Sequence, residues 1–228
     1  MAKKIILAVI VAAMILGGTG CMFKTHKENT PSVNQLALGY LEEKYGEPFT
    51  YAAPWGSSYS GTRAFLVTCE SLPGLSVLVQ VENYNSENPV YSDNFLAVKF
   101  EAQTREFFRE HSEGIFGQVN VFYEASKFSL TGAGEGNLDF PAFQARENNE
   151  IDVLVEVKAP ITASQLQTLA ESIAPFRGNV TVTVIAVDDA TFGTLTRKDL
   201  NALAYRGEAP SGAIRGQGGS YSVEFQED

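Results

Sequence analysis

Few side chains in this sequence have the type and spacing that catalytic or metal chemistry needs. The 228 residues contain two histidines and two cysteines. His26 lies in a polar stretch near the N-terminus, and His111 lies on the apolar side of a segment with helical periodicity, where histidines usually pack at the core boundary. Zinc sites need clusters of such ligands, and a Ser-His-Asp hydrolase lacks the support of a Gly-x-Ser-x-Gly turn. We therefore predict no catalytic residue, no metal site and no cofactor.

Two other patterns could bind a charged ligand, and both have a simpler structural explanation. Asp188 and Asp189 end a strand-like run, where paired carboxylates can hold a hard cation or serve as turn and cap residues. Residues 132–136 read Gly-Ala-Gly-Glu-Gly, which has neither the spacing of a dinucleotide fingerprint nor the Lys-Ser/Thr of a phosphate loop. Because residues 138–141 do not read as a helix start, we interpret this segment as a flexible connector.

Aromatic side chains among glycines and serines provide the remaining candidate for a binding site. Trp55 and Tyr59 lie in the loop at 54–61, close after Tyr51. Such rings can stack on a sugar or pack against a partner, although they also anchor long loops to a core. We predict a ligand-binding role for Trp55 and Tyr59.

The first twenty residues have the organisation of an export signal. Lys3 and Lys4 precede a run of twelve apolar residues, from Ile5 to Leu16, and small residues follow it. The apolar run is shorter than the roughly 20 residues that span a bilayer. A permanent transmembrane anchor is therefore the weaker interpretation.

The end of this signal resembles a bacterial lipobox, with the sequence Leu16-Gly17-Gly18-Thr19-Gly20-Cys21. The resemblance implies that residues 1–20 form a lipoprotein signal peptide and that Cys21 begins the mature chain, carrying a diacylglyceryl thioether. Two acyl chains hold a protein stably at a membrane, so we expect a lipid-anchored protein on the extracytoplasmic face of the cell membrane. A plain secretory signal with a fortuitous cysteine is the alternative.

A second segment points to the same class of protein. The sequence Leu-Glu-Glu-Lys-Tyr-Gly at 41–46 is similar to uncharacterised surface lipoproteins of Gram-positive bacteria. That resemblance implies a location in the cell envelope and a class of protein. It carries no known catalytic residues and implies no activity.

The charge balance excludes one class of partner. The chain has 17 basic and 27 acidic residues, a net charge of −10. Removing Lys3 and Lys4 with the signal leaves 15 basic against 27 acidic residues, a net charge of −12. Such a chain gains no affinity for phosphate backbones from counterion release, so we predict that it binds no nucleic acid. It also repels anionic lipid, so the acyl chains must hold it at the membrane.

Cys69 has no partner for an intrachain disulfide once Cys21 carries the lipid. In strand alternation its side chain shares a face with Phe65 and Val67. We therefore predict a buried and unreactive thiol.

Hydrophobic periodicity and turn residues predict alternating helices and strands after a polar tether at residues 21–32. In the first half they predict a helix at 33–45, strands at 49–53, 62–70 and 75–82, a helix at 95–112 and a strand at 118–125. In the second half they predict a strand at 151–158, a helix at 162–174, a strand at 180–187, a short helix at 197–204, a glycine-rich loop at 207–219 and a strand at 221–226.

Two connections between these elements are also expected. The strands at 62–70 and 75–82 flank turn residues and should form a hairpin. The strand–helix–strand unit at 151–187 has the length of a parallel crossover. Residues 95–100 alternate well enough to be a strand, so the start of the helix at 95–112 is open.

The order of these elements predicts an α+β fold with a mixed, largely antiparallel sheet covered by helices. We divide the mature chain into an N-terminal half at 33–126, a connector at 127–150 and a C-terminal half at 151–228. One continuous domain over 33–228 is an equal alternative.

An export signal joined to a body without a catalytic constellation indicates a non-catalytic binding or structural module of the cell envelope. Its partners would be the membrane, through the lipid anchor, and a protein or envelope component. Two alternatives stay open. An envelope hydrolase would use two carboxylates about 5–10 Å apart in a cleft, and a receptor for a sugar or peptide would have a pocket lined by Trp55 or Tyr59.

Overall fold

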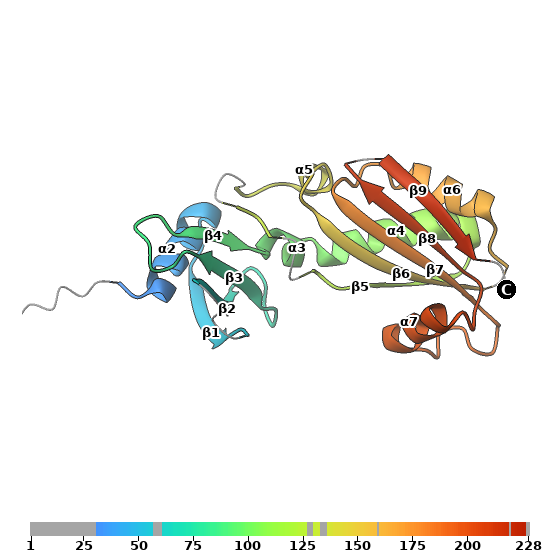
Figure 1. The fold of residues 1–228 in the computed structure, drawn as a ribbon, viewed down its shortest axis with the longest axis horizontal. Coiled ribbons are helices and arrows are strands. Elements are labelled where there is room, and N and C mark those ends of the chain that lie inside the picture. The colour runs from blue at the N-terminus through green and yellow to red at the C-terminus, as the bar shows by residue number, and fades with distance from the viewer. Residues whose placement is uncertain are drawn as a thin grey trace, which may run out of the picture. The chain divides into compact units, whose positions relative to one another are not determined.

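The computed structural model describes residues 31–56, 61–126, 130–132, 136–158, 160–218 and 220–226 (Figure 1). The signal at 1–20, the lipidation site Cys21, the tether up to residue 30 and the aromatic Tyr59 lie outside these ranges. From Val33 onward the chain forms one compact unit by its internal contacts.

The fold is α+β, as predicted, with two mostly antiparallel sheets packed with helices. The first sheet is an antiparallel meander in the order β1-β2-β3-β4. Its strands are β1 (Phe49–Pro54), β2 (Thr62–Cys69), β3 (Val77–Glu82) and β4 (Val90–Asp93). The predicted hairpin is confirmed, because β2 and β3 pair antiparallel.

Helices precede and follow this meander. They are α2 (Val33–Tyr45), α3 (Phe95–Lys99) and α4 (Glu101–Phe116). The helical interpretation of 95–112 is confirmed over the strand alternative, but the helix is broken at Phe100, which is both the C-cap of α3 and the N-cap of α4.

The second sheet has five strands in the order β5-β6-β7-β8-β9. They are β5 (Val119–Tyr123), β6 (Glu150–Lys158), β7 (Asn179–Val187), β8 (Ser211–Gln217) and β9 (Ser220–Gln226). The remaining helices are α5 (Phe140–Gln144), α6 (Ala163–Ser172) and α7 (Arg197–Arg206). The predicted crossover is confirmed, because β6 and β7 pair in parallel and α6 connects them. The other pairings in this sheet are antiparallel.

Helices cover the two faces of the five-stranded sheet unequally. On one face, alternate residues of β6 and β7 such as Val153, Val155 and Val182 join the main core with α4 and α6, which run behind the sheet in Figure 1. On the other face Leu154 and Ile185 form a small cluster with α7. No helix of the described residues covers the remainder of that second face.

The predicted glycine-rich loop at 207–219 is wrong, because most of it is β8. A Cβ atom on Gly212 would lie 2.2 Å from Leu166 Cδ1 of α6, and one on Gly216 would lie 2.5 Å from the Tyr221 ring. These glycines let a helix and a neighbouring ring approach the strand closely, which is a common reason for glycine inside a strand.

The described parts of the predicted connector at 127–150, residues 130–132 and 136–150, contain a bridge and a short helix, whereas residues 133–135 of the glycine-rich run lie outside the described ranges. Thr131 forms an antiparallel bridge with Asp93, and α5 begins at Phe140 with the Asp139 side chain accepting a hydrogen bond from the Ala142 N–H at 2.9 Å. The view that 138–141 do not start a helix is therefore wrong. The helix is a single short turn, and the N-cap aspartate and the following proline are its only local signal.

A buried ion pair links the segment at 130–132 to α2 and β4. Lys44 Nζ of α2 lies 2.8 Å from Asp93 Oδ2, and these side chains are 3% and 0% exposed. Asp93 Oδ1 also accepts hydrogen bonds from the Tyr45 hydroxyl at 2.7 Å and the Thr131 hydroxyl at 2.9 Å. Lys44 donates further to Tyr40 Oη at 2.9 Å and to the Thr131 carbonyl at 3.1 Å. We call these five residues the Lys44–Asp93 network.

Both buried charges of the network are paired with each other and hydrogen-bonded to further groups. A buried carboxylate is stable only when it is paired and hydrogen-bonded, and Asp93 additionally accepts from the Phe95 N–H at 3.0 Å. Burial, reinforced by the charge of Asp93, strongly raises the pKa of Tyr45. Tyr45 therefore stays protonated and remains a hydrogen-bond donor to the carboxylate.

Replacing Asp93→Asn should lower the free energy of unfolding by about 3–5 kcal/mol, because the Lys44 ammonium is then buried without its counterion. Urea denaturation measures the change. The matched control is Asp152→Asn, whose carboxylate also pairs with a cation but is 69% exposed, so its loss should be about 1 kcal/mol or less. Equal effects of the two substitutions would contradict the role assigned to the network.

Replacing Gly178→Ala should destabilise the fold more than Gly207→Ala, although both glycines have positive φ angles, of +91° and +63°. A Cβ atom at Gly178 would lie 2.5 Å from the Asn149 carbonyl oxygen, whereas nothing lies within 4 Å of one at Gly207. We expect a difference of about 1–3 kcal/mol in urea denaturation. A smaller loss at Gly178 than at Gly207 would show that the backbone of Asn149 yields easily.

Candidate functional site

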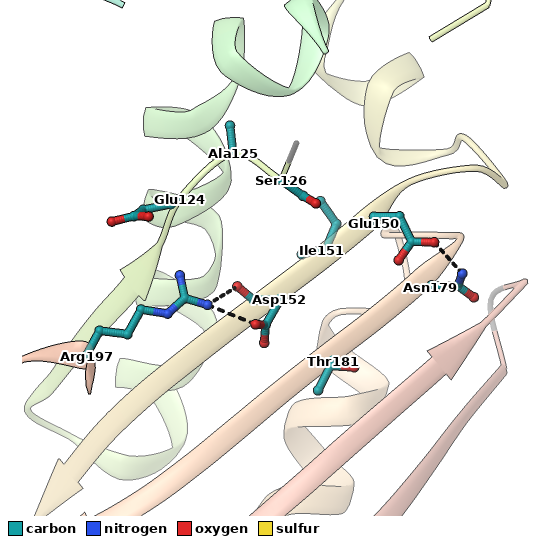
Figure 2. Close-up of a pocket in the computed structure, with 9 residues that line it drawn as sticks. All are labelled: Glu124, Ala125, Ser126, Glu150, Ile151, Asp152, Asn179, Thr181 and Arg197. Carbon is teal, nitrogen blue, oxygen red and sulfur yellow. Dashed lines mark hydrogen bonds and ion pairs between the residues drawn. The ribbon is translucent and has the colours of Figure 1, made fainter. Parts of the chain in front are cut away.

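A depression of the surface lies where β5 and β6 separate. The two strands pair from Val119 opposite Val157 to Tyr123 opposite Val153, and the chain leaves the sheet after Tyr123. The resulting depression has a volume of about 500 Å³. Figure 2 shows Glu124 to Ser126 on one side of it and β6 on the other. We call this place the β5–β6 fork.

Two arginines bind the backbone on either side of the fork. Arg197 Nη2 donates to the Asp152 carbonyl at 3.2 Å and to its Oδ2 at 2.9 Å (Figure 2). Arg105 Nη2 donates to the Tyr123 carbonyl at 3.0 Å. The guanidinium groups thus bind backbone carbonyls where the ladder between β5 and β6 ends.

The start of α7 holds Arg197 in place. Thr196 and Asp199 form a capping box, in which each side chain accepts a hydrogen bond from the other residue's backbone N–H. Hydrogen bonds from the Thr196 hydroxyl and its backbone N–H lower the pKa of the Asp199 carboxyl. Arg197 is therefore the first residue of a well-capped helix, and its side chain reaches across to β6.

The fork opens onto the uncovered face of the five-stranded sheet. Strand alternation places polar side chains on this face, and most of them are exposed: Glu150, Asp152, Asn179, Thr181, Thr183, Arg215, Ser222 and Glu224. A second depression of about 540 Å³ lies across β7, β8 and β9 and shares Asn179 and Thr181 with the first. The two depressions are therefore contiguous. We call this surface the open face.

The fork end of the open face is acidic. Glu124, Glu150 and Asp152 line the first depression with Arg197 as its one basic residue among those described. Two of the carboxylates have partners on the surface, since Asp152 pairs with Arg197 and Glu150 accepts from Asn179 Nδ2 at 2.6 Å (Figure 2). Further along the face, Arg215 lies 3.5 Å from Glu224. Such a surface favours a polar or cationic partner over an anionic one.

The aromatic candidates lie on the other sheet. Trp55 follows β1 and is 39% exposed, and its backbone N–H donates to the Ala64 carbonyl at 3.0 Å. Tyr51 is also 39% exposed, and its ring centroid lies 5.7 Å from that of Phe65. Tyr59 lies outside the described residues. The structure therefore separates Trp55 from the fork, and a ligand-binding role for Trp55 and Tyr59 stays a prediction.

His111 packs against its own helix, and Cys69 lies at the end of a strand. His111 Nδ1 lies 2.8 Å from the Phe107 carbonyl and its ring stacks on Phe107 with centroids 4.0 Å apart, as expected of a boundary histidine. Phe65 and Val67 are buried as predicted, but Cys69 is half-buried because it is the last residue of β2.

Asp188 and Asp189 serve the turn that follows β7. Asp188 Oδ1 accepts from the Thr191 N–H at 2.7 Å, and hydrogen bonds from Thr191 lower the pKa of this carboxyl. Asp189 lies 3.0 Å from Lys158 Nζ. In the described ranges, no three His, Cys, Asp or Glu side chains are grouped so that they could hold a metal ion.

Comparison of the chain with models of protein families, with curated proteins and with solved structures found no match. None of the helices in the described part of the chain has the length and apolar character that a membrane crossing requires.

Sequence reasoning did not find the fork. Glu124, Asp152 and Arg197 lie far apart in the sequence, and each stands alone among ordinary surface residues. One local signal was available, because the Thr196–Asp199 cap places Arg197 at the start of a helix. Its contact with Asp152 depends on how α7 packs on the sheet.

Proposed function

We propose that this protein is a lipid-anchored, extracytoplasmic module of the cell envelope that binds a polar partner through the open face and performs no catalysis. The observation that carries the binding function is the contiguity of the two depressions on one uncovered sheet face. The lipobox-like sequence ending at Cys21 supports the anchor and the location.

The shape of the open face favours an extended or flat partner over a small enclosed ligand. It is built on strands of one sheet, so its backbone is already held by the ladder and needs little ordering on binding. Its acidic fork end complements amino or guanidinium groups on a protein or an envelope polymer. Such a rim of charges governs mainly the rate of association and the choice of partner.

Replacing Cys21→Ala in cells should move the protein from the membrane fraction to the soluble extracytoplasmic fraction, because the acyl chains are lost. Fractionation followed by immunoblotting measures this. Cys69→Ala is the matched control and should leave the protein in the membrane fraction. A Cys21→Ala protein that stays with the membrane would exclude lipidation at Cys21 as the anchor.

A photo-cross-linking residue in place of Thr181, on the open face, should give a discrete adduct on intact cells. The same residue in place of Thr168, exposed on α6 behind the sheet, should give none. Adding Glu124→Gln should reduce the Thr181 adduct several-fold, since it removes an exposed charge at the fork. Equal adducts at Thr181 and Thr168 would reject the open face as the binding surface.

An envelope hydrolase is a second candidate, favoured by the three carboxylates at the fork. Glu150 and Asp152 are two residues apart on one strand, so their Cα atoms lie about 7 Å apart. Both side chains lie on the same face of the strand, as the paired carboxylates of a glycoside hydrolase must. Release of soluble fragments from cell walls by the purified protein, abolished by Glu150→Gln, would favour this candidate over a non-catalytic module.

A further inference from the structure

Most edge strands in the described part of the chain are protected against pairing with another strand. An edge strand presents unpaired backbone N–H and C=O groups, and proteins protect such edges with bulges, prolines, short strands or covering segments. In the four-stranded sheet, β1 has a bulge after Tyr51 and ends at Pro54, and β4 has four residues and a bridge from Asp93 to Thr131. In the five-stranded sheet, β5 has only five residues.

The edge strand β9 has none of these protections (Figure 1). It pairs with β8 through all seven residues, Ser220–Gln226, without a bulge, and it contains no proline and no basic residue. One inner row of the sheet runs through Val153, Val182 and Ile214, which are fully buried, and ends at Val223, which is half-buried. The row is therefore incomplete at the β9 edge, and a further strand would complete it.

The sequence of β9 is nearly symmetric about Val223, which suits antiparallel pairing with a second copy of itself. With a two-fold axis at Val223, Tyr221 lies opposite Phe225 of the second copy and Ser222 lies opposite Glu224 of the second copy. Aromatic pairs directly opposite each other stabilise a sheet. An axis at Glu224 would place like charges opposite each other, which is destabilising. An axis at Ser222 would leave two residues of each β9 unpaired.

The same register brings opposite charges together. Arg215 of β8 lies opposite Ser222 in the ladder, and Ser222 lies opposite Glu224 of the second copy. Two strand spacings, roughly 10 Å, separate the backbones of Arg215 and that Glu224, with only a serine side chain between them. Both side chains are more than half exposed and long enough to meet. This complementarity favours a second copy, although the chain has a net charge of −10.

The helix on the inner face leaves the β9 edge accessible. Leu166 of α6 lies directly above Gly212 of β8, and the Tyr221 ring lies over Gly216 of β8, so both are directed away from the edge. The Tyr221 hydroxyl donates to the Phe176 carbonyl, which holds the ring in this position. Because α6 packs on β8 as well as β9, two copies of α6 would lie at least two strand spacings apart, roughly 10 Å, which is the distance of neighbouring helices.

We propose that two copies of this chain form a dimer by antiparallel pairing of their β9 strands about a two-fold axis at Val223. The pairing continues one five-stranded sheet into the other. Because the axis is perpendicular to the sheet, both open faces lie on the same side of the dimer and form one surface. The dimer does not depend on what the open face binds.

Native mass spectrometry of the full-length chain released from detergent should show a dimer. Val223→Lys should raise the dissociation constant of this dimer at least tenfold, because it places two ammonium groups opposite each other and lysine protects natural edge strands. The matched control is Val90→Lys, at an exposed valine on the β4 edge of the other sheet, which should change nothing. A monomeric unaltered chain, or a dimer that tolerates Val223→Lys, would overturn the proposal.

Cysteine cross-linking tests the register. In a Cys69→Ser background, Val223→Cys should form an intermolecular disulfide on mild oxidation, since side chains directly opposite each other have Cβ atoms about 4.5–5.5 Å apart. Ser222→Cys is more exposed but lies diagonal to its own copy, so it should cross-link several-fold less. Cross-linking of Ser222→Cys at an equal or higher rate would indicate random collision and reject the pairing. If Val223→Cys does not fold, the mass of the unaltered chain still decides.

Discussion

The buried Lys44–Asp93 ion pair is the interaction on which the arrangement of the first sheet depends. It joins the end of α2, the end of β4 and the segment around Thr131. Lys44 in α2 is 49 residues from Asp93 and 87 residues from Thr131 in the sequence. Each buried charge in it has a partner of opposite charge and hydrogen bonds. Removing one member therefore leaves the others buried without a partner in a low-dielectric interior. A network of this kind disfavours any packing of the helix on the sheet that would leave one of these buried groups without its partner.

The second sheet owes its open face to the way in which its helices are distributed. The parallel pair β6 and β7 requires a crossover helix, and α6 packs beside α4 on the same side of the sheet. On the other side α7 covers only Leu154, Ile185 and their neighbours. The strand positions beyond α7 are polar in the sequence because they face solvent. The uncovered area is thus built into the fold, and its polar surface is available to a partner.

Much of the fold could be predicted because it rests on local periodicity. The alternation in β7 and the capped amphipathic helix α6 predicted the crossover unit. The predictions failed where long-range packing decided the outcome. Gly212 and Gly216 look like loop residues in sequence, yet α6 and Tyr221 need the space that their missing side chains leave. Thr131 bridges Asp93, a residue 38 positions away, so no local pattern could place it.

The α+β class, the hairpin, the crossover and the expectation of an anchored envelope protein could all be predicted from the sequence alone. Each rests on a local sequence pattern, such as hydrophobic periodicity, turn residues or the signal at the N-terminus. Only the tertiary structure decided that the strands divide into two sheets, that Arg197 meets Asp152 at the fork, and that β9 lies at an edge of the second sheet. These contacts join residues whose separation in the chain carries no periodic signal. Their positions depend on which buried faces of the helices and sheets pack together, and this packing is determined by residues along the whole chain.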